Sequence, residues 1–158
     1  MWLRTFVLAH NLTQGVAPLD KAPATALIQQ LVQQLKIAHL QGVVHCDIRP
    51  SNVIRFADGA VRLGDWGCSG ELDDKGVFES QPVGVLAWLS DSAVKKWKNN
   101  KPFKYTIYDD LESLAFIYCA LMIGVSQTVY LWTQFVLTSC RSVWLRSLAQ
   151  AVCRPYAH

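Results

Sequence analysis

The sequence predicts a mainly α-helical fold with small β-hairpin elements, and three observations support this fold class. Apolar residues recur at three- and four-residue spacing over 27–38 and 111–121, as on one face of an amphipathic helix. Alternating β-prone residues flank an Asp-Gly pair at 58–59, which is typical of a hairpin. With 51% hydrophobic and 17% charged residues over 158 positions, the chain suits one folded domain and is not disordered.

The first predicted helix covers about 25–40. Thr25 can cap its start and Gly42 can end it. Its apolar and polar residues fall on opposite faces. The apolar positions are Leu27, Ile28, Leu31, Val32, Leu35 and Ala38, and the polar positions are Gln29, Gln30, Gln33 and Gln34.

Residues 64–106 look mostly irregular because Gly, Ser, Asp and Lys interrupt any periodic pattern, and a second helix is predicted from Asp110. Five lysines fall within ten residues of this segment. Two interpretations stay open: a solvated polar loop, or a patch that faces an acidic substrate or a phosphate. The net charge of +3 is too small to indicate nucleic-acid binding. The lysines are Lys95, Lys96, Lys98, Lys101 and Lys104.

The five cysteines form no C-x-x-C pair, so the sequence indicates neither a disulfide framework nor a zinc site. We expect a reducing, cytoplasmic setting by default. The N-terminal residues make a poor secretory signal. The uncharged stretch 114–132 is long enough to cross a bilayer, so a membrane span and a buried helix both stay open at this point.

Three polar segments carry residue types suited to phosphoryl transfer. They are the H-C-D-I-R-P-S-N run at 45–52, the D-W-G triplet at 65–67 and the Y-D-D-L-E-S-L-A run at 108–115. Phosphoryl transfer needs a carboxylate near the acceptor hydroxyl, oxygen ligands for Mg²⁺ and a cation near the phosphate. The residues that can supply them are, in that order, Asp47, then Asn52 with Asp65, then Arg49.

The order of helix, H-x-D-I-[KR]-P-x-N, hairpin and D-x-G is similar to the catalytic lobe of eukaryotic protein kinases over about 25–121. The run G-V-L-A-W-L-S-D-S-A at 84–93, followed by D-D-L-E-S-L-A at 109–115, resembles casein-kinase-one-like and fungal kinase-like families most. The resemblance implies a truncated, protein-kinase-like C-terminal lobe of α+β type. Such enzymes use ATP and Mg²⁺ to phosphorylate Ser or Thr hydroxyls of proteins, so a protein substrate or binding partner is expected and nucleic acid is not.

The resemblance also assigns roles to six residues. Asp47 would be the catalytic base, and Arg49 the cation that contacts the phosphate. Asn52 and Asp65 would be the Mg²⁺ ligands that hold the nucleotide. His45 would be a structural residue of the catalytic loop, and Asp110 the carboxylate that holds the loop backbone. The helix that begins at Asp110 is then the buried centre of the lobe over about 111–124, so a membrane partner is not expected.

Three positions depart from the family pattern. Cys46 stands where the family has Arg, Arg49 where it usually has Lys, and Trp66 where it usually has Phe. A neutral thiol cannot pair with a phosphate as an arginine does. We therefore expect phosphorylation of the following segment, for example at Ser69 or Ser80, not to be an on-switch.

Kinases cover the nucleotide with a small N-terminal lobe that carries a Gly-rich loop, a Lys and a helix-borne Glu. The sequence has no G-x-G-x-x-G and no V-A-I-K motif. We expect a hinge-like remnant and linker at 1–24, the lobe core at 25–124 and a helical tail at 125–158, with the chain alone inactive or nearly so. Two other functions stay open: a pseudokinase or interaction module without catalysis, and a small-molecule phosphotransferase of the aminoglycoside or choline type.

Overall fold

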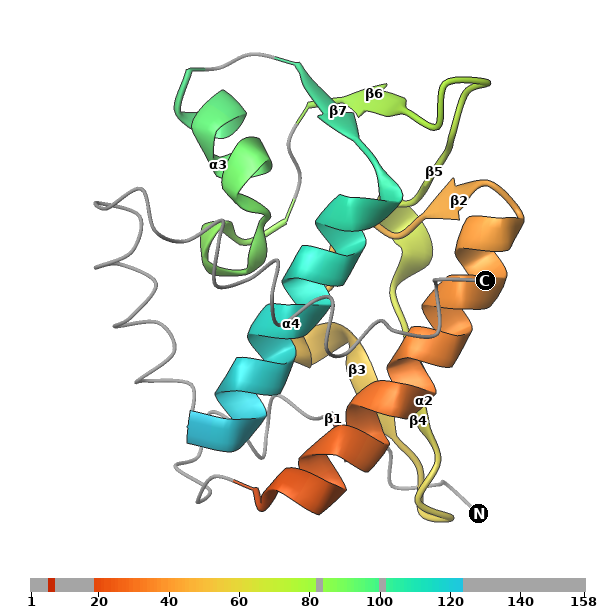
Figure 1. Ribbon diagram of the computed structural model, residues 1–158, viewed down its shortest axis with the longest axis vertical. Helices are drawn as coiled ribbons and strands as arrows, with labels where there is room; N and C mark the ends of the chain where they lie inside the picture. The colour runs from red at the N-terminus through yellow and green to blue at the C-terminus, as the bar shows by residue number, and fades with distance from the viewer. Residues whose placement is uncertain (1–5, 8–18, 82–83, 100–101, 124–158) are drawn as a thin grey trace.

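Two long helices packed side by side form the body of the molecule (Figure 1). The computed structural model describes residues 6–7, 19–81, 84–99 and 102–123. Helix α2 covers Lys21–Leu40 and helix α4 covers Ile107–Ile123, while the shorter α3 covers Asp91–Lys98. Most of the linker predicted at 1–24 and all of the tail predicted at 125–158 lie outside the described residues.

The strands are short and form three small antiparallel sheets. The predicted hairpin is present as β3 and β4, and β1 adds a third strand beside β3. The other two sheets pair β2 with β5 and β6 with β7. The strands are β1 (Phe6–Val7), β2 (Val43–Val44), β3 (Val53–Arg55), β4 (Val61–Leu63), β5 (Gly70–Glu71), β6 (Phe78–Ser80) and β7 (Phe103–Tyr105).

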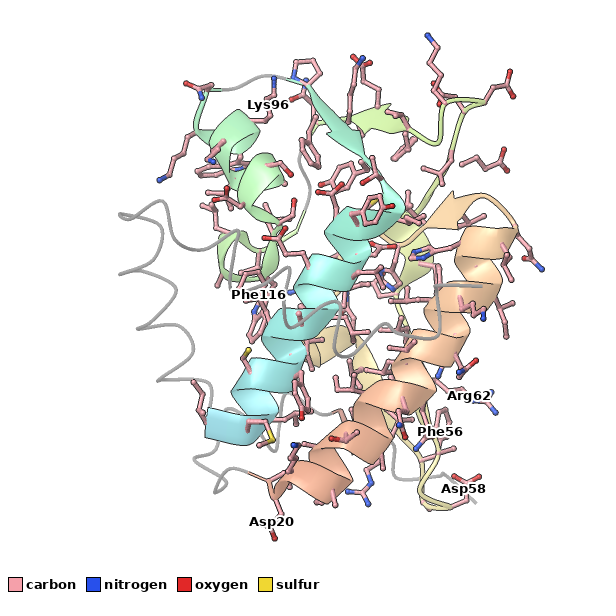
Figure 2. The ribbon with its side chains drawn as sticks, in the orientation of Figure 1. Asp20, Phe56, Asp58, Arg62, Lys96 and Phe116 are labelled. Atoms are coloured by element: carbon pink, nitrogen blue, oxygen red, sulfur yellow. The ribbon has the colours of Figure 1, made fainter. Side chains whose placement is uncertain are left out.

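Helix α2 starts earlier than the sequence predicts. Its N-cap is Asp20, which Figure 2 labels at the start of the helix, and Pro23 is in the first turn, where a missing N–H costs no helical hydrogen bond. The expected cap, Thr25, is wrong: its hydroxyl lies 3.3 Å from that of Tyr118 on α4. The helix ends where predicted, because Gly42 adopts a φ of 73° and its N–H donates to His39.

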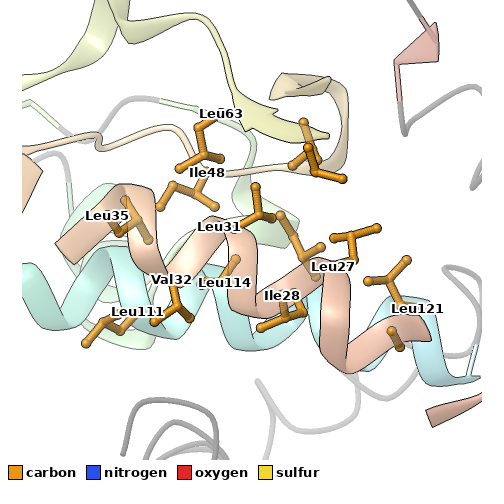
Figure 3. Packing of buried hydrophobic residues seen from close by; sticks show 14 residues of the cluster. Leu27, Ile28, Leu31, Val32, Leu35, Ile48, Leu63, Leu111, Leu114 and Leu121 are labelled. Atoms are coloured by element: carbon orange, nitrogen blue, oxygen red, sulfur yellow. The ribbon is translucent and has the colours of Figure 1, made fainter. Parts of the chain in front are cut away.

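The main hydrophobic core lies between α2 and α4 and extends to the hairpin (Figure 3). Helix α4 is buried around most of its circumference, which accounts for the uncharged sequence up to Ile123. Among the described residues, no helix is both long enough and apolar enough to cross a membrane. The core residues from α2 are Leu27, Ile28, Leu31, Val32 and Leu35, and those from α4 are Leu111, Leu114, Ile117 and Leu121.

The expectation of a mostly irregular 64–106 segment is wrong. The segment contains β5, β6, a 3₁₀ turn at Leu86–Trp88, α3 and β7, and these elements pack around a second apolar cluster. Three of the clustered lysines lie on α3, which Figure 2 marks at Lys96, and a fourth lies on β7. Strands of two or three residues are too short to leave a periodic pattern in a sequence. The buried members of the cluster are Val44, Cys46, Leu89, Ala93, Val94, Phe103 and Tyr105.

Two glutamines on the polar face of α2 bind the free edge of β4. The Val61 N–H donates to Gln30 Oε1 at 3.0 Å, and the Leu63 N–H donates to Gln34 Oε1 at 2.9 Å. Gln34 also donates from Nε2 to the Val61 carbonyl at 2.6 Å. On the other side of the hairpin, the Arg62 guanidinium lies 5.2 Å from the centre of the Phe56 ring, and both residues are labelled in Figure 2. The helix thus covers an edge that would otherwise lack hydrogen-bond partners.

Replacing Gln34 by alanine is expected to destabilise the fold. The substitution leaves the backbone groups of Val61 and Leu63, both buried residues, without their side-chain partners, which costs about 1–3 kcal/mol of unfolding free energy. Urea denaturation measures the change. Gln33→Ala on an exposed position of the same helix is the matched control and should shift stability by less than about 0.5 kcal/mol. Equal midpoints for the two variants would contradict this role of Gln34.

Candidate active site

The Asp110 carboxylate, in the first turn of α4, anchors the start of the 45–52 loop. It accepts the His45 N–H at 2.8 Å through Oδ2 and the Cys46 N–H at 3.0 Å through Oδ1. His39, from the last turn of α2, places its Nε2 2.9 Å from the same Oδ2. Asp110 is only 1% exposed, so these contacts are shielded from water. Cys46 has a φ of 65°, a strained conformation that these hydrogen bonds help to hold.

His45 links the loop to the end of β4. Its Nδ1 accepts the Asp47 N–H at 3.3 Å, so its Nε2 carries the hydrogen and donates to the Gly64 carbonyl at 3.1 Å. The ring is fully buried and lies 4.5 Å, centre to centre, from that of Trp66. The Gly64 N–H in turn donates to the Asn52 carbonyl at 2.7 Å. The glycine just before Asp65 is therefore held to the loop through both its N–H and its carbonyl.

Asp47 is oriented by two donors on a single carboxylate oxygen. Asn52 donates from Nδ2 to Asp47 Oδ2 at 2.9 Å and to the Asp47 carbonyl at 2.9 Å. Arg49 donates from Nε to the same Oδ2 at 3.0 Å. Oδ1 accepts no hydrogen bond from the described residues and faces Gly84. A Cβ at Gly84, where φ is 96°, would lie 2.6 Å from Oδ1, so only glycine fits there.

Asn52 and Asp65 carry oxygen atoms of the kind that bind a magnesium ion. Because Asn52 uses its amide nitrogen on Asp47, its Oδ1 is turned away from Asp47. Among the described residues it accepts a hydrogen bond only from the Ser51 hydroxyl, at 3.5 Å. Asp65 is exposed, adopts a left-handed φ of 57°, and makes no hydrogen bond or ion pair with the described residues. Amide and carboxylate oxygens are the donors that Mg²⁺ prefers. Mg²⁺ usually keeps waters and substrate phosphates as further ligands, so two protein side chains are an adequate set.

The structure joins the six residues singled out from the sequence in one network. Five of them are linked by side-chain hydrogen bonds, and Asp65 is joined through the backbone of Gly64. Sequence reasoning missed two contributors, His39 and Gly84. His39 gave a weak signal as a basic residue in the last turn of a helix, and Gly84 gave none beyond being a glycine. The five joined by side chains are His45, Asp47, Arg49, Asn52 and Asp110.

Cys46 joins this network through its backbone N–H, while its thiol is buried in the second apolar cluster. Burial and the neighbouring Asp110 carboxylate raise its pKa far above the ordinary value of 9.0, because both disfavour the thiolate. Cys119, buried on α4, has its pKa raised by burial to about 11. Within the described residues no group of three or more His, Cys, Asp or Glu side chains is arranged so that it could hold a metal ion.

Asp110→Asn is expected to loosen the loop. The amide keeps the shape of the carboxylate but has one acceptor oxygen and no charge, so at least one of the three groups that face Asp110 loses its partner. The expected loss is about 2–3 kcal/mol of unfolding free energy, together with faster amide hydrogen exchange at His45 and Cys46. Asp74→Asn, the same change at an exposed turn position, should have little effect. Unchanged exchange in Asp110→Asn would contradict the anchoring role.

The buried thiols predict a loss of stability at alkaline pH. A native pKa above the unfolded value of about 9.0 means that unfolding releases a proton above pH 9, so each thiol's contribution is complete below pH 9 and declines as pH rises. For Cys119 the decline is about 1.4 kcal/mol per pH unit between pH 9 and its native pKa of about 11. In Cys119→Ala, the unfolding free energy obtained from urea denaturation should fall less steeply with pH over this range, by that amount per pH unit. An unchanged slope would show that the thiol is not shielded.

Comparison with known proteins identifies a family. A family model described as "Protein kinase domain" matches residues 4–129. The Calcium/calmodulin-dependent protein kinase kinase of Caenorhabditis elegans is 31% identical over 107 residues, which are 68% of this chain and 19% of that protein.

Two further relatives match shorter stretches. Mitogen-activated protein kinase kinase kinase 17 of Arabidopsis thaliana is 29% identical over 82 residues, 52% of this chain and 22% of that protein. Serine/threonine-protein kinase mos of Gallus gallus is 36% identical over 69 residues, 44% of this chain and 20% of that protein. The chain thus matches about a fifth of the length of each of these relatives. Since the family model covers well over half of the chain, the chain belongs to the protein kinase domain family.

Proposed function

We propose that this chain supplies the catalytic lobe of a Ser/Thr protein kinase, which transfers the γ-phosphoryl group of ATP to a protein hydroxyl. The observation that carries the proposal is the orientation of Asp47. One carboxylate oxygen is held by Arg49 and Asn52, and the other is left free beside Gly84. A carboxylate that is held in place and keeps one oxygen free can align an acceptor hydroxyl.

In this proposal Asp47 orients the acceptor through Oδ1 and receives its proton. The acceptor hydroxyl donates its hydrogen to Oδ1, which directs the oxygen lone pair away from the carboxylate and toward the phosphate. Gly84 leaves room for this approach, since any side chain there would collide with Oδ1. The two donors fix Oδ2 and leave Oδ1 available to the acceptor hydroxyl.

Asn52 and Asp65 hold Mg²⁺ in this proposal. A Mg²⁺ ion held there would neutralise the charge of the nucleotide phosphates. The chain contributes the placement of the two oxygens: Asn52 is fixed by its two hydrogen bonds to Asp47, and Asp65 is fixed by the doubly bonded Gly64 before it. Asp65 itself is free of protein partners among the described residues, so its carboxylate is available to an ion.

Arg49 is placed to contact a phosphate. Within the described residues only its Nε is engaged, on Asp47, and its side chain is 30% exposed. The two terminal amino groups of the guanidinium remain available, and a planar fork of donors matches phosphate oxygens well. The family's usual Lys would place a single ammonium here. Arg49, by contrast, can bind Asp47 and a phosphate at once through different nitrogens.

We further propose a casein-kinase-one-like or fungal kinase-like placement, supported by how Ser90 is used. Ser90 is almost fully buried, accepts the Ala93 N–H at 3.2 Å as the N-cap of α3, and donates to Asp109 Oδ1 at 2.6 Å. The 84–93 run and the D-D-L-E-S run that carry the resemblance are thus in direct contact through Ser90 and Asp109. This ordered segment favours a protein acceptor over choline or an aminoglycoside.

The same proposal expects weak nucleotide binding and little transfer by these 158 residues alone. They contain no Gly-rich phosphate-covering loop and no V-A-I-K lysine, which supply several of the phosphate contacts in active kinases. The Mg²⁺ ligands and the acceptor-orienting carboxylate are nevertheless present. A pseudokinase role differs in one respect: the nucleotide would bind and no phosphate would appear on any acceptor.

Mg-ATP is expected to raise the melting temperature of the chain in a manner that depends on Asp65. A ligand at ten times its Kd stabilises the native state by about 1.4 kcal/mol, which a thermal melt detects. The shift should require Mg²⁺ and vanish in Asp65→Asn, since asparagine tolerates the left-handed backbone but removes the charge. Asp74→Asn, at an exposed turn, is the matched control and should keep the shift.

The outcomes separate the candidate functions. No shift at millimolar Mg-ATP, or a shift that persists in Asp65→Asn, would contradict the assignment of the metal site. Incubation of the chain with ATP labelled at the γ-phosphate and a mixture of protein and small-molecule acceptors then identifies the reaction. Label on protein Ser or Thr, even at the low level expected of these 158 residues alone, supports the kinase. Label on choline or an aminoglycoside supports the small-molecule enzyme, and binding with no detectable label on any acceptor supports the pseudokinase.

A further inference from the structure

Residues 66–81, which we call the strap, begin directly after Asp65, run outward along β5 and return along β6 (Figure 1). Asp73 closes the outer turn of the strap. Its Oδ1 accepts the N–H groups of Lys75 and Val77 at 2.9 Å each, and its own N–H donates to the Val77 carbonyl at 2.8 Å. Among the described residues β5 pairs with β2 and β6 pairs with β7, so no sheet joins β5 to β6. The two arms of the strap therefore meet through side chains.

The ring of Phe78 on β6 lies where a side chain at Gly70 on β5 would be. A Cβ at Gly70 would overlap Cδ1, Cε1 and Cζ of this ring. Gly70 is not among the glycines with a positive φ, so its backbone conformation is open to other residues and the constraint is space. The missing side chain of Gly70 thus makes room for the Phe78 ring.

Phe78 also packs on the second apolar cluster. It stands opposite Tyr105 in the β6–β7 ladder, with the two ring centres 6.4 Å apart, and Phe103 meets Tyr105 edge-on at 4.5 Å. Tyr105 and Phe103 are 2% and 4% exposed, so the residues beneath Phe78 are fixed by burial. The Phe78 ring therefore links β5, which follows the turn after Asp65, to the well-packed strand β7.

We propose that Phe78 is a positioning residue: its ring, placed on Gly70, holds the strap closed and thereby fixes Asp65. Asp65 has a φ of 57°, a backbone conformation that persists only where the surrounding structure holds it. The hydrogen bonds of Gly64 hold it from the preceding side, and the strap holds it from the following side. Strand β5 pairs with β2 over two residues, which is too short to hold the strap alone.

The consequence for a metal ion rests on the proposed function, in which Asp65 is a Mg²⁺ ligand. A side chain that supports a ligand from behind sets its orientation, and its loss weakens metal binding even though it never touches the metal. The contact between Phe78 and Gly70 can be tested without any ligand.

Amide hydrogen exchange in a double-mutant cycle tests the contact. In Gly70→Ala the new methyl group displaces the ring, and in Phe78→Ala the ring is removed. Each variant should speed exchange at Ser69 and Leu72 by about tenfold or more, because the hydrogen bonds of these two N–H groups open with the strap. In the Phe78→Ala background the methyl group has space, so Gly70→Ala should add little.

The Mg²⁺ dependence of the Mg-ATP melting shift tests the positioning of Asp65. In both single variants the Mg²⁺ concentration that gives half of the shift should rise by about tenfold. A merely structural contact would lower the melting temperature and leave this concentration unchanged. Glu79→Ala is the matched control: Glu79 follows Phe78 on β6, points to the opposite face and places its carboxylate 4.0 Å from the Lys104 ammonium, so both measurements should stay unchanged.

Three results would overturn the proposal. They are an equal effect of Gly70→Ala in both backgrounds, unchanged exchange in the single variants, and an unchanged Mg²⁺ concentration alongside faster exchange. If the unsubstituted chain shows no Mg-ATP shift, the proposed function fails, and the exchange cycle alone decides whether Phe78 holds the strap. Phe78→Val keeps part of the apolar volume and suits a strand, so it takes the place of Phe78→Ala if that variant does not fold.

Discussion

The carboxylate of Asp110 is the constraint on which the site depends. It holds two backbone N–H groups of the 45–52 loop and the His39 ring of α2, so it joins segments that are 65 and 71 residues away in sequence. Because α4 is packed against α2 over its apolar face, the core sets where this carboxylate lies. The hydrophobic packing of the two helices therefore determines where the polar 45–52 loop lies.

The 45–52 loop fixes Asp65 indirectly, through the backbone of the preceding Gly64. Asn52 and His45 bind the N–H and the carbonyl of Gly64, and Asp65 follows directly. Gly64 itself follows β4, a three-residue strand that would be marginal alone. Two glutamines of α2 complete the free edge of β4, so the same helix that forms the core also steadies the strand that carries Asp65.

Elements with a periodic sequence pattern could be predicted from the sequence. The helix over about 25–40 and the hairpin were predicted because a buried stripe and an Asp-Gly turn are local signals. The polar residues of 45–52 were singled out because they are close in sequence. The start of α2 was misplaced, since Pro23 looks like a helix breaker but is tolerated in a first turn. The 64–106 segment, His39 and Gly84 were missed because their roles arise from contacts between distant residues.

The adjacent acids at the start of α4 serve two different segments. Asp109 accepts the hydroxyls of Ser90 at 2.6 Å and Ser92 at 3.1 Å on Oδ1, and the N–H and hydroxyl of Thr106 on Oδ2 at 2.8 and 3.0 Å. It thus fixes the start of α3, while Asp110 fixes the 45–52 loop. The segment that begins at Gly84 is therefore held to α4 by hydrogen bonds. One turn of one helix therefore sets the distance between the loop that bears Asp47 and the segment that closes over it.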